Sequence, residues 1–367
     1  MMHIGDEAMF EQFLDQSRLR GASDVVAISA NPDETVSRYA VEAVPRLGLT
    51  GDRTALLERA HRILTGDLPV DDPAHATLEA VASADRVVVT GAGNLASTWP
   101  QHIVERWTLS RLAAARGIPF IVTGQTLGPA LTPHDSALLT EMLDSAALVG
   151  VREPSSLALA TRLGIDAVQT IDDASFLAIE RPSPPELTAP YCLVTLSTHV
   201  GSSERGAFQT RVAAYLDEIV AATGLEIVFF AHFGPLAGDP HRGDVVMHEA
   251  VRALMTSPSS VVPTGDSTSA AWLSRRASLA VSSRYHPAVF AVAAGVPTIG
   301  ISVDDYTGVK LRGALGNFGQ TTVFTIDELG SPAEVWGERA GIRSRSIELA
   351  DARRPESSRW WDRVVAP

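Results

Sequence analysis

The sequence is almost free of lysine and cysteine. Only one of its 30 basic residues, Lys310, is a lysine, so an anionic ligand has to be held by arginines, helix N-termini or backbone amides. Cys192 is the only cysteine, which excludes an intrachain disulfide and a thiolate metal cluster. Its apolar neighbours indicate a small core residue.

Positive charge is also scarce overall. The chain has 43 acidic and 30 basic residues, and its net charge of −13 would repel the phosphates of a nucleic acid or an anionic membrane. The uncharged stretch Pro287–Val303 is too short and too interrupted by glycine and proline to span a bilayer. The N-terminal residues MMHIGDEAMFEQ lack the basic and apolar regions of a signal peptide. We therefore expect a cytoplasmic protein without a transmembrane segment.

Short β-branched runs alternate with amphipathic segments, which is typical of parallel βα units. The strands expected in a first sheet are 25–29, 86–90, 120–123, 148–151 and 167–171, and those expected in a second sheet are 191–196, 226–230, 259–262, 279–282 and 298–301. The proline-rich residues 181–190 separate the two sets.

This pattern predicts an α/β protein with two doubly wound, Rossmann-like domains, 1–180 and 191–330, joined by the linker 181–190. The tail 331–367 is predicted to be helical and to pack back on the first domain. The carboxyl ends of both sheets would face a shared cleft, which is where such sheets bind ligands.

The segment Ser282–Pro287, SSRYHP, is the richest in chemically active side chains. It follows an expected strand, and Pro287 is expected to begin a helix. Arg284 and His286 would then lie at a helix N-terminus, where free amides and an arginine fork can bind phosphate or carboxylate. His286 could act there as an acid or base. The alternative is a capping loop with a surface arginine.

Arg152 repeats this pattern in the first domain, since it follows a strand and precedes a helix that begins with proline; the alternative is a surface position. The residues Gly91–Ala96 match a dinucleotide-binding fingerprint only weakly, because no acidic residue ends the next strand, and a simple glycine turn is favoured.

Two further segments are rich in acidic residues or histidine. One segment contains His232, Asp239, His241, Asp244 and His248. The spacing of these residues fits no compact metal motif, so no metal is expected. Asp172 and Asp173 are adjacent and would point in opposite directions in an extended chain, so that one of them could face the cleft.

These residues fall in motifs that resemble the polysaccharide pyruvyl transferase family over most of the chain. The matching pieces, in the order of the family, are GDEAMF, VVVTGAGNL, FIVTGQTLGP, VREPSSLALATRLGI, IDDASFL, SSRYHPAVFAVAAGVPTIGI and DDYTGVKLRGAL. This chain departs from the family pattern in starting almost inside the loop that holds GDEA, and in having GAG where three glycines are more usual.

The resemblance implies a fold like that of GT-B glycosyltransferases and transfer of pyruvate from phosphoenolpyruvate onto two sugar hydroxyls as a ketal. It implies that Arg152, Arg284 and His286 contact phosphoenolpyruvate, which is a co-substrate, so that no cofactor is needed. The motifs add Ser283, Gly5, Asp6, Gly91, Gly93 and Asn94 as candidate substrate-binding residues.

Lys310 either faces the cleft as a further substrate contact or is a solvated surface lysine. A carbohydrate acceptor is expected, with peripheral membrane contact if that acceptor is lipid-linked. The alternatives are a glycosyltransferase that uses a nucleotide sugar and a catalytically silent binding protein on the same fold.

Overall fold

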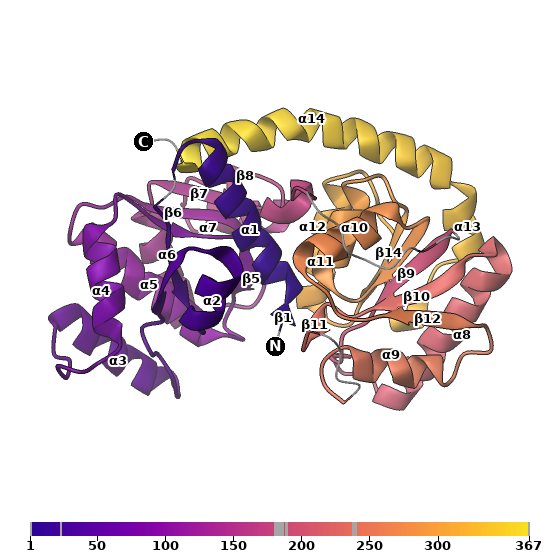
Figure 1. The fold of residues 1–367 in the computed structure, drawn as a ribbon, viewed down its shortest axis with the longest axis horizontal. Coiled ribbons are helices and arrows are strands. Elements are labelled where there is room, and N and C mark those ends of the chain that lie inside the picture. The colour runs from indigo at the N-terminus through magenta and orange to yellow at the C-terminus, as the bar shows by residue number, and fades with distance from the viewer. Residues whose placement is uncertain (1, 23, 180–186, 188–189, 237–240, 366–367) are drawn as a thin grey trace. The chain divides into compact units, whose positions relative to one another are not determined.

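The computed structural model describes residues 2–22, 24–179, 187, 190–236 and 241–365 and is drawn in Figure 1. The chain forms two compact units. The C-terminal unit consists of Met1–Gln12 and Ile171–Ser357, and the N-terminal unit consists of Phe13–Thr170 and Ser358–Pro367. The expected domain boundaries therefore differ from these units at both ends of the chain. Most of the expected linker, residues 181–186, 188 and 189, lies outside the described residues.

The N-terminal unit is built on a parallel sheet with the strand order β4-β6-β7-β8, and β5 also pairs with β6. The strands are β4 (Val87–Val89), β5 (Ala92–Leu95), β6 (Phe120–Leu127), β7 (Leu148–Val151) and β8 (Val168–Gln169). The helices around it are α3 (Arg53–Thr65), α4 (Ala74–Ser83), α5 (Pro100–Ala114), α6 (Pro133–Asp144) and α7 (Pro154–Arg162).

The strand expected at 25–29 does not join this sheet. It is β2 (Val26–Ser29), which pairs in parallel with β3 (Glu42–Pro45) in a separate two-stranded sheet beside α2 (Pro32–Tyr39). The burial of β2 agrees with this position, since Val26 is exposed whereas strands inside a parallel sheet are covered on both faces.

Both faces of the N-terminal sheet are covered. Phe120 and Val122 belong to one core cluster with residues of α3 to α7, while Ile121 packs on the opposite face against Trp360 and Trp361 of α14 (Arg339–Val365). The last turns of α14 therefore complete the N-terminal unit. Gly150 is required for this contact, since a Cβ atom there would lie 2.4 Å from Cζ2 of Trp360.

The C-terminal unit holds a six-stranded parallel sheet with the order β12-β10-β9-β13-β14-β15. The strands are β9 (Tyr191–Thr195), β10 (Glu226–Phe230), β12 (Ser259–Val262), β13 (Leu279–Ser282), β14 (Thr298–Ser302) and β15 (Val323–Thr325). The helices are α8 (Arg205–Thr223), α9 (Val245–Arg252), α10 (Ser267–Arg276), α11 (Tyr285–Val292), α12 (Asp305–Gly316) and α13 (Pro332–Gly337), with 3₁₀ turns η1 (Asp173–Phe176) and η2 (Ile326–Glu328).

The N-terminal end of the chain packs on this second sheet. β1 (Met2–His3) pairs with β11 (Phe233–Gly234), and α1 (Ile4–Leu19) follows it. Leu193 and Val228 pack with α1, α10 and α11 on one face, whereas Val194 and Phe229 pack with α8 and α9 on the other. In the part of the chain that the structure describes, no helix has the length and apolar character needed to cross a membrane.

Candidate active site at the carboxyl edge of the C-terminal sheet

The two central strands of the C-terminal sheet define a switch point. From β9 the chain continues to β10 and β12 on one side, and from β13 it continues to β14 and β15 on the other. Loops that leave such neighbouring strands diverge and open the crevice in which α/β sheets bind ligands. Ser283, one of the predicted residues, ties the two loops together because its buried Oγ accepts a hydrogen bond from the Ser197 amide at 2.8 Å.

Helix α11 begins at Tyr285, two residues before the expected start at Pro287. The expected start was wrong because a proline is tolerated anywhere in the first turn, where the amides have no partner inside the helix. Arg284 is consequently the N-cap residue and His286 the second residue of the helix. Both still lie at the carboxyl edge of the sheet, directly after β13.

Arg284 forms an ion pair with the fully buried carboxylate of Asp244. Its Nε donates to Oδ2 at 3.0 Å and to Oδ1 at 3.2 Å, and Nη2 donates to Oδ1 as well. Burial raises the pKa of Asp244, but the Arg284 guanidinium and the amides of His232 and Phe233 oppose that rise. Because Asp244 occupies the Nε–Nη2 edge of the guanidinium, the Nη1 edge is the one that could take a ligand.

His286 lies between a carboxylate and a helix. Its Nε2 is 3.7 Å from Oδ2 of Asp172, and its side chain is only 12% exposed. On the Nδ1 side is Gly5, in the first turn of α1, where a Cβ atom would come within 1.8 Å of Nδ1. The imidazole thus lies between a carboxylate on one side and the helix backbone on the other.

Gly5 and Asp6 were both expected in the first domain, but α1 places them in the C-terminal unit up to Gln12. The amide of Ile4 donates to the carbonyl of His232 at 3.2 Å, which anchors the helix start. Asp6 is exposed. A contact of Gly5 or Asp6 with substrate stays a prediction.

Two further histidines are buried beside this site. Burial lowers the pKa of His232 well below 6.5, and the charges of His286 and Arg284 lower it further. Burial likewise lowers the pKa of His248 to about 3, and its Nε2 accepts a hydrogen bond from the Leu196 amide at 2.9 Å. Both rings are therefore neutral near pH 7. Asp239, from the same polar segment, lies outside the described residues.

Lys310 on α12 lies next to the start of α11. Its Nζ is 5.0 Å from the ring centroid of Tyr285 and 4.5 Å from that of Tyr306, whose hydroxyl it contacts at 3.0 Å. Tyr285 precedes His286, and its ring packs edge-on against the imidazole. The lone lysine is thus half-buried against the neighbour of His286 rather than fully solvated.

Arg152 lies in the N-terminal unit at the carboxyl end of β7. Its side chain is 1% exposed, its Nε donates to Oγ1 of Thr126 at 2.8 Å, and Glu153 Oε2 lies 3.6 Å away. The surface alternative is therefore wrong. The helix α7 does begin with proline, at Pro154, as the sequence predicts.

Gly91, Gly93 and Asn94 do not form the expected turn between a strand and a helix. After Gly91 the chain enters β5, which runs along the second half of β6 in parallel, and α5 begins only at Pro100. The long, buried β6 offers hydrogen-bond partners beyond the end of β4, and β5 uses them. The side-chain oxygen of Asn94 accepts a hydrogen bond from Arg106.

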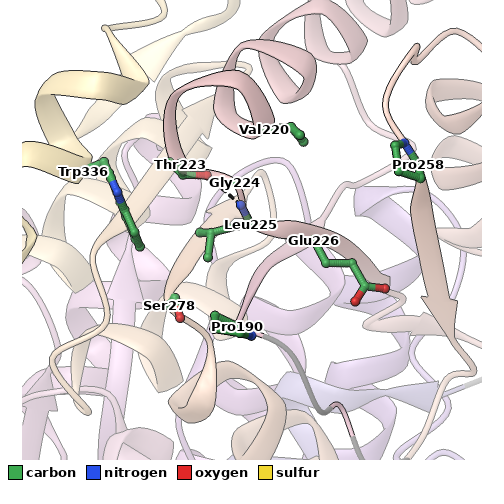
Figure 2. Close-up of a pocket in the computed structure, with 9 residues that line it drawn as sticks. All are labelled: Pro190, Val220, Thr223, Gly224, Leu225, Glu226, Pro258, Ser278 and Trp336. Atoms are coloured by element: carbon green, nitrogen blue, oxygen red, sulfur yellow. Dashed lines mark hydrogen bonds between the residues drawn. The ribbon is translucent and has the colours of Figure 1, made fainter.

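A hollow of about 590 Å³ lies elsewhere, at the amino ends of the strands of the C-terminal sheet. Figure 2 shows the residues that line it: Pro190, Val220, Thr223, Gly224, Leu225, Glu226, Pro258, Ser278 and Trp336. Glu226 is the charged residue in this set, and its negative charge would repel an anion. The edge that carries His286 is the opposite one, so this hollow is not the candidate site.

Sequence reasoning missed the two carboxylates that face the predicted site residues. The sequence suggests a role for Asp244 only within a metal cluster, and it does not distinguish Asp172 from Asp173. The sequence separates Asp244 from Arg284 by 40 residues, so no local spacing signals that pair. The one available signal was the DD pair itself after an expected strand.

Comparison with known proteins shows the family of this chain. The family model described as polysaccharide pyruvyl transferase matches residues 3–305. No curated protein sequence matches the chain.

Solved structures with a similar fold include UDP-GlcNAc 2-epimerase from Neisseria meningitidis bound to UDP-GlcNAc, at 14% identity and a TM-score of 0.59, covering 97% of this chain and 95% of that one. UGT89C1 from Arabidopsis thaliana complexed with quercetin has 10% identity and a TM-score of 0.56, covering 100% and 97%. These likenesses establish the GT-B fold, with two Rossmann-like α/β units, and the family match covers most of the sequence. The chain belongs to the polysaccharide pyruvyl transferase family.

Proposed function

We propose that the protein transfers pyruvate from phosphoenolpyruvate onto two hydroxyls of a sugar or glycan acceptor, forming a ketal and releasing phosphate. The observation that carries the proposal is the placement of Arg284 and His286 together at the start of α11, directly after β13, in a member of this family. A carbohydrate acceptor fits the family. The protein would act in the cytoplasm, where phosphoenolpyruvate is formed.

Phosphoenolpyruvate carries a phosphate and a carboxylate, and an acidic protein must bind it with local positive charge. The first-turn amides of α11 supply donors for one anionic group, and the helix dipole favours negative charge there. The Nη1 edge of Arg284 would add a charge-assisted contact, because Asp244 occupies only the other edge. Lys310 supplies a further cation beside Tyr285.

His286 is the proposed general acid. The proton passes from His286 to the methylene carbon of phosphoenolpyruvate, which leaves a cationic carbon at C2. One acceptor hydroxyl attacks C2 and returns its proton to His286. The bond from C2 to the phosphate oxygen then breaks, phosphate leaves, and a second hydroxyl attacks C2 and gives its proton to phosphate. General acid–base help of this kind contributes about 10²- to 10⁴-fold.

Arg152 stays a predicted donor-binding residue on the family resemblance. Its neighbour Glu153, whose Oε2 lies 3.6 Å from Nε, balances part of its charge. Its own test is separate: Arg152→Met should weaken phosphoenolpyruvate binding, as measured by calorimetry.

The decisive experiment offers the full chain phosphoenolpyruvate and a panel of sugar, nucleotide-sugar and lipid-linked acceptors. We expect phosphate release, and an acceptor product that gains the mass of one pyruvate minus one water. His286→Gln should abolish turnover but keep thermal stabilisation by phosphoenolpyruvate. Turnover of this variant at the wild-type rate would refute the acid role.

A nucleotide-sugar glycosyltransferase is the second candidate, since a structure of similar fold is described with UDP-GlcNAc bound. It predicts thermal stabilisation by UDP, GDP or CDP compounds and none by phosphoenolpyruvate. A silent binding protein predicts ligand binding without product in every arm of the panel.

A further inference from the structure

A histidine and an aspartate join two loops at the carboxyl edge of the C-terminal sheet. Nε2 of His199, in the loop after β9, lies 2.7 Å from Oδ2 of Asp304, in the loop after β14. In the sheet, β13 lies between these two strands. The pair therefore links the loops that follow both neighbours of the strand that leads to Arg284 and His286.

The loop that carries His199 is held in place at this edge. The His199 amide donates to Oγ of Ser197 at 3.1 Å, and the Ser197 amide donates in turn to Oγ of Ser283. Farther along the loop, a Cβ atom on Gly201 would lie 1.9 Å from the carbonyl oxygen of Val303. The two loops therefore touch along their backbones, and hydrogen bonds connect His199 to the loop after β13.

Asp304 is the anchored member of the pair. Its Oδ1 accepts hydrogen bonds from the amide and the hydroxyl of Thr307 at 2.7 and 2.8 Å, which cap α12. Burial would raise the pKa of Asp304, but hydrogen bonds from His199 and Thr307 hold it below its usual value. The carboxylate is therefore ionised near neutral pH and can only accept hydrogen bonds. Nε2 of His199 consequently carries the proton that points at Oδ2.

This contact leaves Nδ1 of His199 with a lone pair in the neutral ring. The side chain is 58% exposed, and among the described residues Nδ1 has no hydrogen-bond partner. An imidazole can take up and release a proton near neutral pH. A carboxylate on its other nitrogen orients the ring and stabilises the imidazolium, which is how histidine activates a hydroxyl in many enzymes.

The charge of the pair suits an uncharged ligand. Phosphoenolpyruvate is an anion that calls for the positive groups at the start of α11, whereas the carboxylate of Asp304 would repel it. A sugar hydroxyl carries no charge and must lose its proton when it attacks C2. The acceptor, rather than the donor, is therefore the substrate that this pair fits.

We propose that His199 is the general base for the acceptor and that Asp304 positions it. The second hydroxyl gives its proton to Nδ1 as its oxygen bonds to C2, and the Asp304 carboxylate stabilises the imidazolium. His199 then passes this proton to the released phosphate, so that the net reaction is unchanged. This inference rests on the proposed function for the identity of the donor.

The test measures product formation by His199→Gln and His199→Ala with phosphoenolpyruvate and the acceptor that wild type uses. Glutamine keeps a hydrogen-bond donor for Asp304 but cannot take up a proton, so kcat should fall about 10²-fold or more, while thermal stabilisation by phosphoenolpyruvate remains. Added imidazole should restore part of the rate of His199→Ala, because the free base can enter the space of the lost ring. A mere loop contact would not be restored in this way.

Two further variants separate proton transfer from loop order. Asp304→Asn can still cap α12 through Oδ1, but its amide group would donate to Nε2 and leave the ring proton on Nδ1, so kcat should fall without rescue by imidazole. Arg205→Met is the matched control. The exposed Arg205 holds the same loop by donating to the carbonyl of Thr198 at 3.3 Å, and its loss should leave kcat at the wild-type value.

The outcomes separate this inference from the proposed function. A wild-type kcat in His199→Gln, or no rescue of His199→Ala by imidazole, overturns the inference, and so does an equal loss of kcat in Arg205→Met. If wild type instead transfers a sugar from a nucleotide sugar and His199→Gln abolishes that reaction, the base role stands and the proposed function fails. If wild type forms no product with either donor, both are wrong.

Discussion

Replacing Gly5 with alanine perturbs the His286 ring without touching a charge. Gly5 lies in α1 with ordinary helical backbone, so alanine by itself would favour the helix by about 1 kcal/mol. The added Cβ atom, however, would lie 1.8 Å from Nδ1 and 2.3 Å from Cε1 of His286, whereas ordinary contacts are 3.4–4 Å. The ring or the helix must therefore move by at least about 1.6 Å, the difference between these contacts.

A shift of this size has two measurable consequences. Overpacking of a buried site lowers the free energy of unfolding by about 1–3 kcal/mol, which exceeds the gain in helix propensity. Misplacement of a catalytic group by about 1 Å costs on the order of 100-fold in rate. We expect Gly5→Ala to show both, in urea denaturation and in phosphate release from phosphoenolpyruvate.

Gly316→Ala is the matched control. Gly316 lies at the end of α12 in the same unit, and a Cβ atom there would have no atom within 4 Å. This variant should be as stable as wild type or more stable by up to about 1 kcal/mol, and it should keep the wild-type rate. Should Gly5→Ala behave like Gly316→Ala in both assays, the packing of α1 against His286 is not as described and the reasoning is refuted.

Three further predictions concern charged groups. Burial would raise the pKa of Asp135, but hydrogen bonds from Arg53 and two hydroxyls hold it at about 2, below the unfolded value of 3.8. The ion pair of Arg53 and Asp135 therefore stabilises the fold by about 2 kcal/mol above about pH 4, and this stabilisation is lost as the pH falls toward 2. Asp135→Asn should remove the stabilisation, so that the free energy of unfolding depends less on pH in acid denaturation. Arg284→Met leaves Asp244 buried without its cation and should cost about 3 kcal/mol of stability and all phosphoenolpyruvate binding. Arg284→Lys should restore the stability but not the binding, which calorimetry measures. Equal binding by the two variants would contradict the role of the planar fork. Lys310→Met should change stability by less than about 1 kcal/mol but raise the KM for phosphoenolpyruvate about tenfold, and an unchanged KM would remove Lys310 from the site.

Much of the fold follows from the sequence because its signals are local. The strands at 148–151, 226–230, 259–262 and 279–282 have the expected bounds, since short apolar runs closed by turn residues mark buried parallel strands. The separate pairing of β2 and the continuation of Gly91 into β5 could not be read in the same way. Both depend on which neighbouring strand offers free hydrogen-bond partners, a property of the assembled sheet.

The same distinction between local signals and long-range contacts applies to the candidate site. That Arg284 and His286 follow a strand and begin a helix can be read from six consecutive residues. The pairing of Asp244 with Arg284, the position of Asp172 beside His286 and the packing of Gly5 on the imidazole appear only once the chain is folded. These contacts join residues far apart in the chain, and their formation depends on the winding of the sheet around its switch point.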